Sequence, residues 1–455
     1  MFYISFYISK IVRCILRLFK RNATTLPGKI ALKLYPNFLN KIAKPKLIIG
    51  VTGTNGKTTV CNLLNSFYEK QGYKVVSNKY GSNLNSGIAS SLIKDTSIFN
   101  KTKCDIAIFE IDERSAPKIL PYLKLDYFVC TNLFRDSIRR EANPDFIFDL
   151  LNKYVSKDTK LILNADDLIS SAIGKNNEKI YFGIDKLDSD KTTIENIVCD
   201  ARICPNCLSK LKYNYIKYHH LGNAICPNCG FKSPEADYMV TDINYVDRTI
   251  TVKNNNKISK YNLINNGIYN VYNMIIVIAT LRELNVDDKK IKEFFETEKI
   301  VESRYKKDVI KDINIISIMS KGQNAIACSC VFDYVRKEPN KKEIILILFD
   351  LFDNDGSSEN LAWIYDCDFE FLNDENIDKI IVGGPRCDDF GLRLLLAGVP
   401  KDKLFIIKNE LDTINYLSLD KEKDIYILYE LYDNKIANNI RLKLINKLIR
   451  GNEDD

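Results

Sequence analysis

Histidine is almost absent from this sequence: the 455 residues contain two, and these are adjacent, His219 and His220. Catalytic units of the Ser-His or Cys-His kind need a histidine that the fold brings beside a nucleophile. There is no second, distant histidine to build such a unit. Chemistry that needs a histidine elsewhere in the chain is therefore excluded.

Long hydrophobic runs are also absent. Residues 1–19 are largely apolar, but Lys10, Arg13 and Arg17 interrupt them. They contain no uninterrupted span of about 20 apolar residues, the length of a membrane-crossing helix, and no cleavage site typical of a signal peptide. Two interpretations stay open: a helix packed on the body of the protein, or a basic amphipathic segment that touches an anionic membrane surface.

The composition is that of a folded protein. Hydrophobic residues make up 45% and charged residues 27% of the chain, which excludes global disorder and collagen-like repeats. The net charge of +7 is compatible with an anionic ligand but does not by itself indicate nucleic acid. Several of the 13 cysteines, among them Cys61, Cys104 and Cys130, lie in apolar runs. This pattern indicates buried thiols in a reducing compartment rather than a disulfide framework.

Short apolar strands alternate with helical stretches along most of the chain, which predicts an α/β fold with a central parallel sheet. Strands are expected at 47–49, 74–77, 105–111, 126–130 and 160–163, and helices at 59–70 and 271–284. A second α/β stretch follows, with strands at 343–349, 379–382, 403–407 and 424–429. The predicted organisation is a leader region at 1–45, an ATP-binding domain at 46–300 and a smaller C-terminal α/β domain at 301–455.

A glycine-rich turn lies between the first predicted strand and helix, and it reads Gly53-Thr54-Asn55-Gly56-Lys57-Thr58-Thr59. Glycines let backbone N–H groups approach phosphates, and the start of the helix adds a favourable dipole. In such a loop Lys57 would reach the β- and γ-phosphates of ATP, and Thr58 would ligate Mg²⁺. The usual glycine five positions before Gly56 is replaced by Val51. The sequence predicts a nucleotide site here.

The predicted strand 105–110 ends in a carboxylate, Glu110. In a parallel sheet the carboxyl end of this strand lies at the same edge as the phosphate loop. Because Mg²⁺ prefers oxygen ligands, Glu110 is the candidate magnesium ligand, and Asp112 and Glu113 are less suited. A solvated acidic strand end is the alternative interpretation.

Two CxxC pairs, Cys204/Cys207 and Cys226/Cys229, are separated by eighteen residues between about 199 and 236. This spacing predicts a ribbon that holds one structural Zn²⁺, because four thiolates leave no open position for water. Two disulfides are the competing interpretation. His219 and His220 lie between the pairs and are expected to be surface or fold-supporting residues. The insert lacks a clear basic and aromatic stripe, so nucleic acid is not the expected partner.

The phosphate loop resembles the ATP loop of the Mur ligase family, which makes peptidoglycan precursors. Other stretches that resemble family signatures follow in order: Glu110; Thr131-Asn132-Leu133 with Asp136; Asn164-Ala165-Asp166-Asp167; Gly267-Ile268-Tyr269-Asn270-Val271-Tyr272-Asn273; and Arg304. The resemblance implies that Asn270 and Asn273 contact adenine and that Arg304 contacts the nucleotide phosphates.

A narrower resemblance is to the ligase-like subunits of lipid II isoglutaminyl synthases, on residues 26–32, 363–370 and 383–398. It implies that ATP, with Mg²⁺, activates the D-glutamate α-carboxyl of lipid II as an acyl phosphate and that ammonia converts it to D-isoglutamine. The ammonia would come from a GatD-like glutaminase subunit in a heterodimer at the inner face of the cytoplasmic membrane. In the family an aspartate of the ligase subunit completes the partner's Cys-His unit. Asp366 and Asp368 both match, and Asp366 is preferred.

Some stretches depart from the family pattern. Ser137 stands where ordinary Mur ligases carry a metal-binding histidine, and residues 318–324 and 350–362 are altered. Three alternatives therefore stay open: a Mur-type ligase that adds an amino acid to a muropeptide, a zinc-ribbon ATPase that binds nucleic acid, and a scaffold that binds nucleotide without turnover.

Overall fold

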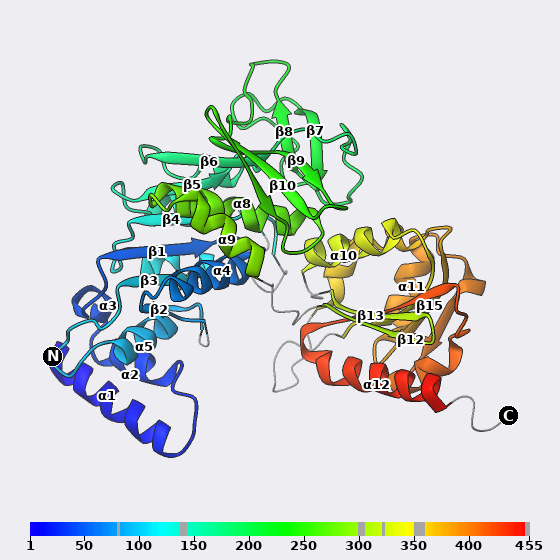
Figure 1. Cartoon of the computed structure of the whole chain (residues 1–455), viewed down its shortest axis with the longest axis horizontal. Helices are drawn as coiled ribbons and strands as arrows, with labels where there is room; N and C mark the ends of the chain where they lie inside the picture. The colour runs from blue at the N-terminus through cyan, green and yellow to red at the C-terminus, as the bar shows by residue number, and fades with distance from the viewer. Residues whose placement is uncertain (80–81, 137–142, 299–304, 321–323, 350–359, 451–455) are drawn as a thin grey trace. The chain divides into compact units, whose positions relative to one another are not determined.

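A computed structural model describes residues 1–79, 82–136, 143–298, 305–320, 324–349 and 360–450. The chain forms two compact units (Figure 1). Unit 1 comprises Met1–Arg135, Asn143–Thr193 and Asp200–Ile300, and unit 2 comprises Asp136–Ala142, Ile194–Cys199 and Val301–Asp455. A short segment from the middle of the chain thus belongs to the C-terminal unit.

Unit 1 is built on a sheet that has nine strands in the described residues, in the order β11-β10-β9-β6-β5-β4-β1-β3-β2. From β9 to β2 neighbouring strands are parallel, and β10 and β11 are antiparallel additions at one edge. The strands are β1 (Leu47–Thr52), β2 (Val75–Ser77), β3 (Ile106–Glu110), β4 (Tyr127–Cys130), β5 (Lys160–Asn164), β6 (Lys179–Ile184), β9 (Tyr238–Asn244), β10 (Thr249–Asn254) and β11 (Lys257–Asn262). The predicted α/β class with a central parallel sheet is confirmed.

The central strand β1 shows why this sheet forms. Its sequence, Leu-Ile-Ile-Gly-Val-Thr, is apolar for five residues and almost wholly buried, as expected of a strand covered on both faces. It pairs with β3 on one side, where Leu47 faces Ile106, and with β4 on the other, where Ile49 faces Tyr127. The helices α4 (Lys57–Lys70) and α8 (Ile268–Glu283) contact one another and the sheet.

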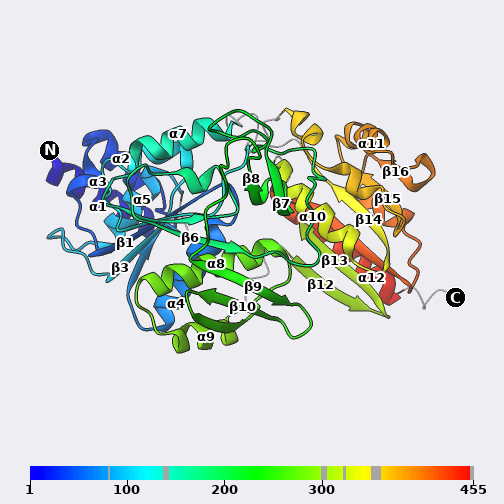
Figure 2. The same ribbon diagram turned by 90° about the horizontal axis from the view of Figure 1, so that it is seen from above.

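The other face of the sheet is covered by α5 (Asn85–Asp95) and by three helices at the N-terminus, α1 (Phe2–Leu18), α2 (Leu26–Leu34) and α3 (Phe38–Lys41). Both views show these four helices gathered beside the N-terminus (Figures 1 and 2). Phe2 and Phe6 of α1 pack with Phe38 in the core of this face. The first helix is therefore packed on the body of unit 1, and no helix in the described ranges has the length and hydropathy needed to cross a bilayer.

The insert between β6 and β9 holds a two-stranded hairpin, β7 (Lys212–Tyr218) and β8 (Leu221–Ile225). Two further helices of unit 1 are α7 (Pro144–Tyr154) and α9 (Asp288–Thr297). The antiparallel strands β9 to β11 were not predicted. In β11 (Lys-Ile-Ser-Lys-Tyr-Asn) only Ser259 and Tyr261 are buried, so this edge strand lacks the apolar run by which the parallel strands were recognised.

Unit 2 has a sheet of six strands among the described residues, in the order β12-β13-β17-β14-β15-β16. All neighbours are parallel except β12 and β13, which form a hairpin. The strands are β12 (Tyr305–Ile310), β13 (Ile313–Met319), β14 (Lys341–Ile347), β15 (Ile377–Gly383), β16 (Leu404–Ile407) and β17 (Lys423–Tyr429). The helices α10 (Ala325–Lys337) and α11 (Cys387–Leu396) cover one face, and α12 (Asn434–Arg450) covers the other. The expected C-terminal α/β architecture is present.

Candidate active site

The predicted phosphate loop connects β1 to α4, and Lys57, Thr58 and Thr59 form the first turn of that helix. Two of its glycines have backbone angles that favour glycine, with φ of 122° at Gly53 and 91° at Gly56. A side chain at Gly53 would place its Cβ 2.1 Å from Thr131 Oγ1. The loop thus takes a shape that other residues would strain.

Residues after β4 hold this loop in place. The N–H of Thr54 donates to the carbonyl of Asn132 (2.8 Å), and the N–H of Asn55 donates to the Asn132 side chain (3.0 Å). The hydroxyl of Thr131 donates to the carbonyl of Asn55 (2.6 Å). Among the described residues nothing accepts from the N–H groups at positions 56–58, the start of α4. These are the N–H groups that a helix start offers to an anion.

Lys57 is the cation of the loop. Its Nζ lies 2.7 Å from Glu113 Oε1 and also donates to the carbonyl of Gly53. Burial by itself would lower the pKa of Lys57, but Glu113, with help from Glu110 and Asp112, outweighs burial and raises that pKa. Lys57 is therefore positively charged at neutral pH and is held at the loop by a carboxylate.

Glu113 is a site residue whose role the sequence did not reveal. It was considered only as a weaker magnesium candidate, whereas it binds both the Lys57 ammonium and the N–H of Gly53 (3.0 Å). Asp112 caps the short 3₁₀ helix that begins at Glu113 by accepting from the N–H of Arg114. The position just beyond the acidic end of β3 was the only signal that could have pointed to Glu113.

Thr58 and Glu110 come together at the edge of the sheet. Because β1 and β3 pair in parallel, with Val51 opposite Glu110, both strands end at this edge. The hydroxyl of Thr58 donates to Glu110 Oε2 (2.9 Å), and Asn78 exchanges two hydrogen bonds with the backbone of Glu110 (2.8 and 2.9 Å). A hydroxyl and a carboxylate are oxygen ligands of the kind that Mg²⁺ takes beside a nucleotide. This donor set fits magnesium.

The two asparagines predicted at adenine lie on α8 and are buried. Asn273 lies against the phosphate loop, where its Oδ1 would be 2.4 Å from a Cβ built at Gly56. The Asn270 amide donates to the carbonyl of Asn266 (2.7 Å). Their contact with adenine stays a prediction, and so does the role of Arg304, which lies outside the described residues.

A buried polar group supports the segment that holds the loop. Asp167 accepts from the N–H of Leu133 (2.7 Å) and lies 3.3 Å from His220 Nε2, and the His220 ring packs 4.5 Å from that of Phe134. The backbone N–H of Phe134 in turn donates to the Thr54 hydroxyl (2.9 Å). This is a continuous set of contacts from His220 to the phosphate loop.

His219 and His220 form the tip of the β7–β8 hairpin and are fully buried. Their expected position at the surface is wrong, because the tip packs beneath Phe134 instead of facing water. Neither belongs to the cysteine cluster, which agrees with the expectation that they are not metal ligands. The histidines instead join the insert to the phosphate-loop region.

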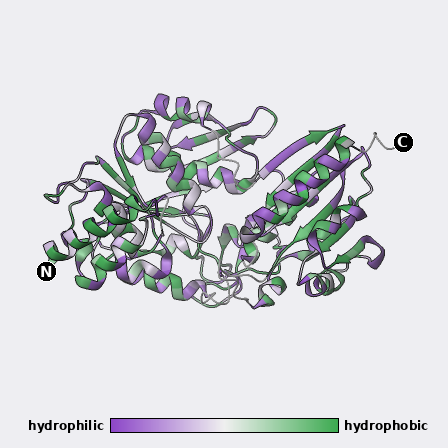
Figure 3. Cartoon of the chain, turned by 90° about the horizontal axis from the view of Figure 1, so that it is seen from below, coloured by the Kyte–Doolittle hydropathy of each residue, from purple (hydrophilic) through white to green (hydrophobic). Residues whose placement is uncertain are grey.

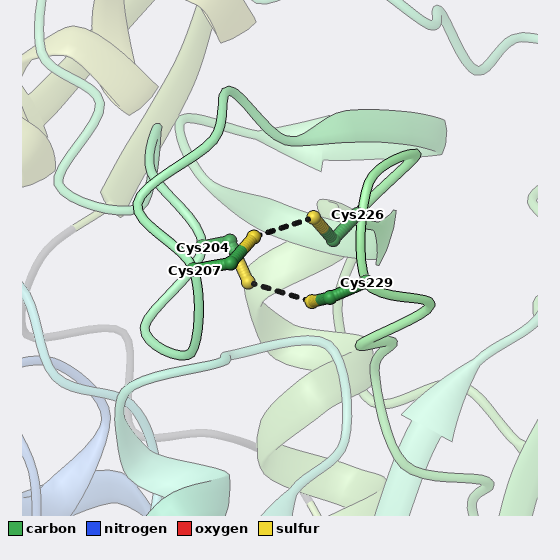
Figure 4. Close-up of side chains that lie close together, drawn as sticks. All are labelled: Cys204, Cys207, Cys226 and Cys229. Atoms are coloured by element: carbon green, nitrogen blue, oxygen red, sulfur yellow. Dashed lines mark hydrogen bonds between the residues drawn. The ribbon is translucent and has the colours of Figure 1, made fainter.

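The four insert cysteines converge (Figure 4). Their sulfurs all lie within 4.8 Å of one another, with 3.6 Å between Cys204 and Cys229 and 3.4 Å between Cys207 and Cys226. These distances are too long for disulfides, which need about 2.05 Å, and all four are free thiols. Four sulfurs around one Zn²⁺, each bonded at about 2.3 Å, are a few ångströms apart. The cluster fits a structural zinc site.

Asp366 and Asp368 lie in unit 2 in different environments. Asp368 is buried, and its carboxylate accepts from the Asn196 amide (2.8 Å) and from the N–H of Ile197 (2.6 Å). Asp366 follows the short 3₁₀ helix Leu361–Tyr365 and is half-buried. The carboxylate of Asp368 is thus occupied within its own unit, while Asp366 is partly open to solvent.

Comparisons with known proteins bear on both units. Residues 51–281 match the Mur ligase middle domain, and residues 322–432 match the MurT ligase C-terminal domain. The chain is similar to the lipid II isoglutaminyl synthase (glutamine-hydrolyzing) subunit MurT of Staphylococcus aureus strain COL, with 32% identity over 86% of this chain and 87% of that protein. It is also similar to the subunit of the same name from Streptococcus pneumoniae, with 30% identity over 89% of each.

Solved structures share the fold. A pseudomurein peptide ligase type C from Methanothermus fervidus superposes with a TM-score of 0.62 and 23% identity, over 90% of this chain and 79% of that one. MurF from Acinetobacter baumannii superposes with a TM-score of 0.64 and 13% identity, over 93% of this chain and 80% of that one.

We expect the zinc cluster to support nucleotide binding. The double variant Cys204→Ser, Cys226→Ser should lose its bound zinc by elemental analysis, because two ligands are removed. The loosened hairpin would no longer hold His220 beneath Phe134. The affinity for ATP with magnesium, measured by calorimetry, should then fall on the order of tenfold, which corresponds to about 1.4 kcal/mol.

The control for this experiment is Cys14→Ser, because Cys14 is exposed and lies outside the cluster. It should keep the zinc content and the ATP affinity of the parent protein. An unchanged ATP affinity in the zinc-free double variant would show that the insert and the loop are not coupled.

Proposed function

The chain belongs to the Mur ligase family, and within it to the MurT subunits of lipid II isoglutaminyl synthase; on this premise we propose that it amidates the D-glutamate α-carboxyl of lipid II through an acyl phosphate, with ammonia from a glutaminase partner. It is an ATP-dependent ligase subunit of peptidoglycan synthesis. The observation that carries the proposal is the meeting of Lys57, Thr58 and Glu110 at one edge of the sheet.

The first proposed step is phosphoryl transfer. An oxygen of the substrate carboxylate attacks the γ-phosphorus of ATP, the bond to the β-phosphate oxygen breaks, and ADP leaves. The N–H groups at the start of α4 and the Lys57 ammonium bind the phosphate oxygens, and Lys57 exchanges Glu113 for them. Thr58 and Glu110 would hold Mg²⁺, which neutralises the charge that develops on the transferring group.

The second proposed step is amide formation. The lone pair of ammonia attacks the acyl carbon, the bond from that carbon to the phosphate oxygen breaks, and inorganic phosphate leaves with the excess proton going to solvent. Ammonia attacks only in its unprotonated form, so a sheltered supply favours the reaction. The two histidines of this chain are buried beside Phe134, which supports a partner protein as the holder of the Cys-His unit that releases ammonia.

We propose Asp366 as the residue that orients the partner's histidine. A carboxylate suits this role because it fixes the tautomer of an imidazole and stabilises its charged form. Asp368 already accepts hydrogen bonds from Asn196 and Ile197, which favours the more accessible Asp366. Asp368 would then act as a structural residue of unit 2.

The first test addresses the phosphate loop. In the complex with the glutaminase, Lys57→Ala should lower the formation of amidated lipid II by about 10²–10³-fold, as expected when a charged group that stabilises the transition state is removed. Mass spectrometry of the lipid product measures this. The control is Lys70→Ala on the same helix, where the lysine is half exposed and pairs with Glu298.

Two results would contradict the assignment. Unchanged amidation in Lys57→Ala would remove Lys57 from the mechanism. ATP consumption with an amino acid, in the absence of any glutaminase, would instead favour a Mur-type amino-acid ligase, and ATP hydrolysis stimulated by nucleic acid would favour a zinc-ribbon ATPase.

The second test separates the two aspartates. Asp366→Asn should lower glutamine-dependent amidation by on the order of 10²–10⁴-fold, while amidation driven by added ammonium salt stays near that of the parent complex. Asp368→Asn should instead lower the thermal stability of the protein, because a buried acceptor of two hydrogen bonds is altered. A loss of glutamine-dependent activity in Asp368→Asn alone, with normal stability, would reverse the assignment.

A further inference from the structure

The positive charge of this protein is concentrated at its beginning. Residues 1–46 contain ten Lys and Arg residues and no Asp or Glu, whereas residues 47–455 contain 56 Lys and Arg and 59 Asp and Glu. The excess of +7 over the whole chain therefore comes from its first tenth. In the structure this segment forms the helices α1 to α3 and the links that join them.

The outer side of α1 is apolar. Ile4, Ile8, Ile11, Ile15 and Leu18 are spaced by four or three residues, so they lie along one face of the helix, and all five are exposed to solvent. The opposite face buries Phe2 and Phe6 in unit 1. The ribbon beside the N-terminus is accordingly hydrophobic over much of its length (Figure 3). We call these five residues the apolar stripe.

A cationic hollow lies against the other side of the helix. It has a volume of about 410 Å³ and is lined by five basic side chains, five polar ones and Ala23. The basic residues are Arg13, Arg17, Lys20, Arg21 and Lys94, and the polar ones are Asn22, Thr24, Ser77, Ser90 and Ser91. No carboxylate lines the hollow, and in the described part of the chain none of the five cations forms an ion pair.

The cations of this region repel one another. Burial lowers the pKa of Arg13, and the neighbouring Arg17 lowers it further. Burial and Arg13 likewise lower the pKa of Lys10, the preceding basic residue of α1, to about 8. An anion in the hollow would relieve this repulsion, and hydroxyl groups such as those of Ser90 and Ser91 could donate to its oxygens.

The apolar and cationic features meet at one end of α1. Leu18 and Phe19 are 81% and 74% exposed, and the next two residues, Lys20 and Arg21, line the hollow. An apolar helix face beside basic side chains is the arrangement by which helices lie in the interface of an anionic bilayer. Each basic residue near such a surface contributes about 1 kcal/mol to binding.

We propose that α1 docks unit 1 on an anionic lipid bilayer, with the apolar stripe inserted at the interface and the cationic hollow taking the phosphate of a lipid headgroup. A second copy of this chain does not suit the same surface, because it would bring two acid-free segments of ten positive charges together. The inference rests on the described residues of α1, α5 and the link between α1 and α2, and it is independent of the ligase reaction.

Vesicle sedimentation with the full chain tests the proposal. Vesicles of equal parts phosphatidylglycerol and phosphatidylcholine should bind the protein at least tenfold more tightly than vesicles of phosphatidylcholine alone, and added salt should weaken the binding. Ile11→Glu with Ile15→Glu should lower the affinity at least tenfold, and so should Arg13→Gln with Arg17→Gln and Lys94→Gln.

Matched controls change the same chemistry elsewhere in unit 1. Val246→Glu with Ile258→Glu alters two exposed apolar residues, and Lys289→Gln with Lys290→Gln removes two exposed charges of α9. These variants should bind vesicles like the parent protein. Thermal unfolding and ATP binding should be the same in all variants, which separates membrane docking from folding and from the proposed ligase function.

Three results would overturn the proposal. The first is the absence of binding to phosphatidylglycerol vesicles by the folded parent protein. The second is binding of inorganic phosphate or pyrophosphate at the hollow, lost in the Arg13, Arg17 and Lys94 variant, without any binding to vesicles. The third is a concentration-dependent dimer in sedimentation analysis that the Ile11 and Ile15 variant abolishes while vesicle binding is absent.

Discussion

The parallel pairing of β1 with β3 is the constraint on which the site depends. It places Val51 opposite Glu110, so the phosphate loop begins and the acidic strand ends at one edge of the sheet. A slip of one residue would turn Glu110 to the opposite face of the sheet, away from Thr58. The pairing is held by buried apolar residues such as Ile49 and Ile108, so the precision of a polar site is supplied by packing of the core beneath it.

Around this pairing the chain adds supports from distant segments. Asn132 and Thr131 after β4 bind the loop backbone, and Asn78 after β2 binds the backbone of Glu110. The insert hairpin reaches the same region through His220 and Phe134. These contacts come from residues next to strand ends or at a turn. Strand ends carry the chemistry, while the strands themselves fix where the ends lie.

Much of this could be predicted from local patterns. Apolar runs located β1, β3 and β4, and a glycine-rich turn followed by Lys57 and Thr58 located the loop, because each signal lies within a few consecutive residues. The role of Glu113 could not be predicted, since its pairing with Lys57 depends on the path of the chain after β3. The cationic hollow was equally hidden, because its lining comes from α1, β2 and α5. The antiparallel edge strands escaped notice because they are polar on one side.

The segment Ile194–Cys199 belongs to unit 2 although it leaves and re-enters unit 1. Its Asn196 and Ile197 satisfy the buried carboxylate of Asp368, and its Glu195 pairs with Arg336 (3.2 Å). A gene fragment that starts near residue 301 would therefore encode an incomplete fold with an orphaned acid. The two halves of this protein cannot be exchanged as separate cassettes during recombination, because each junction would have to carry this short strap with it.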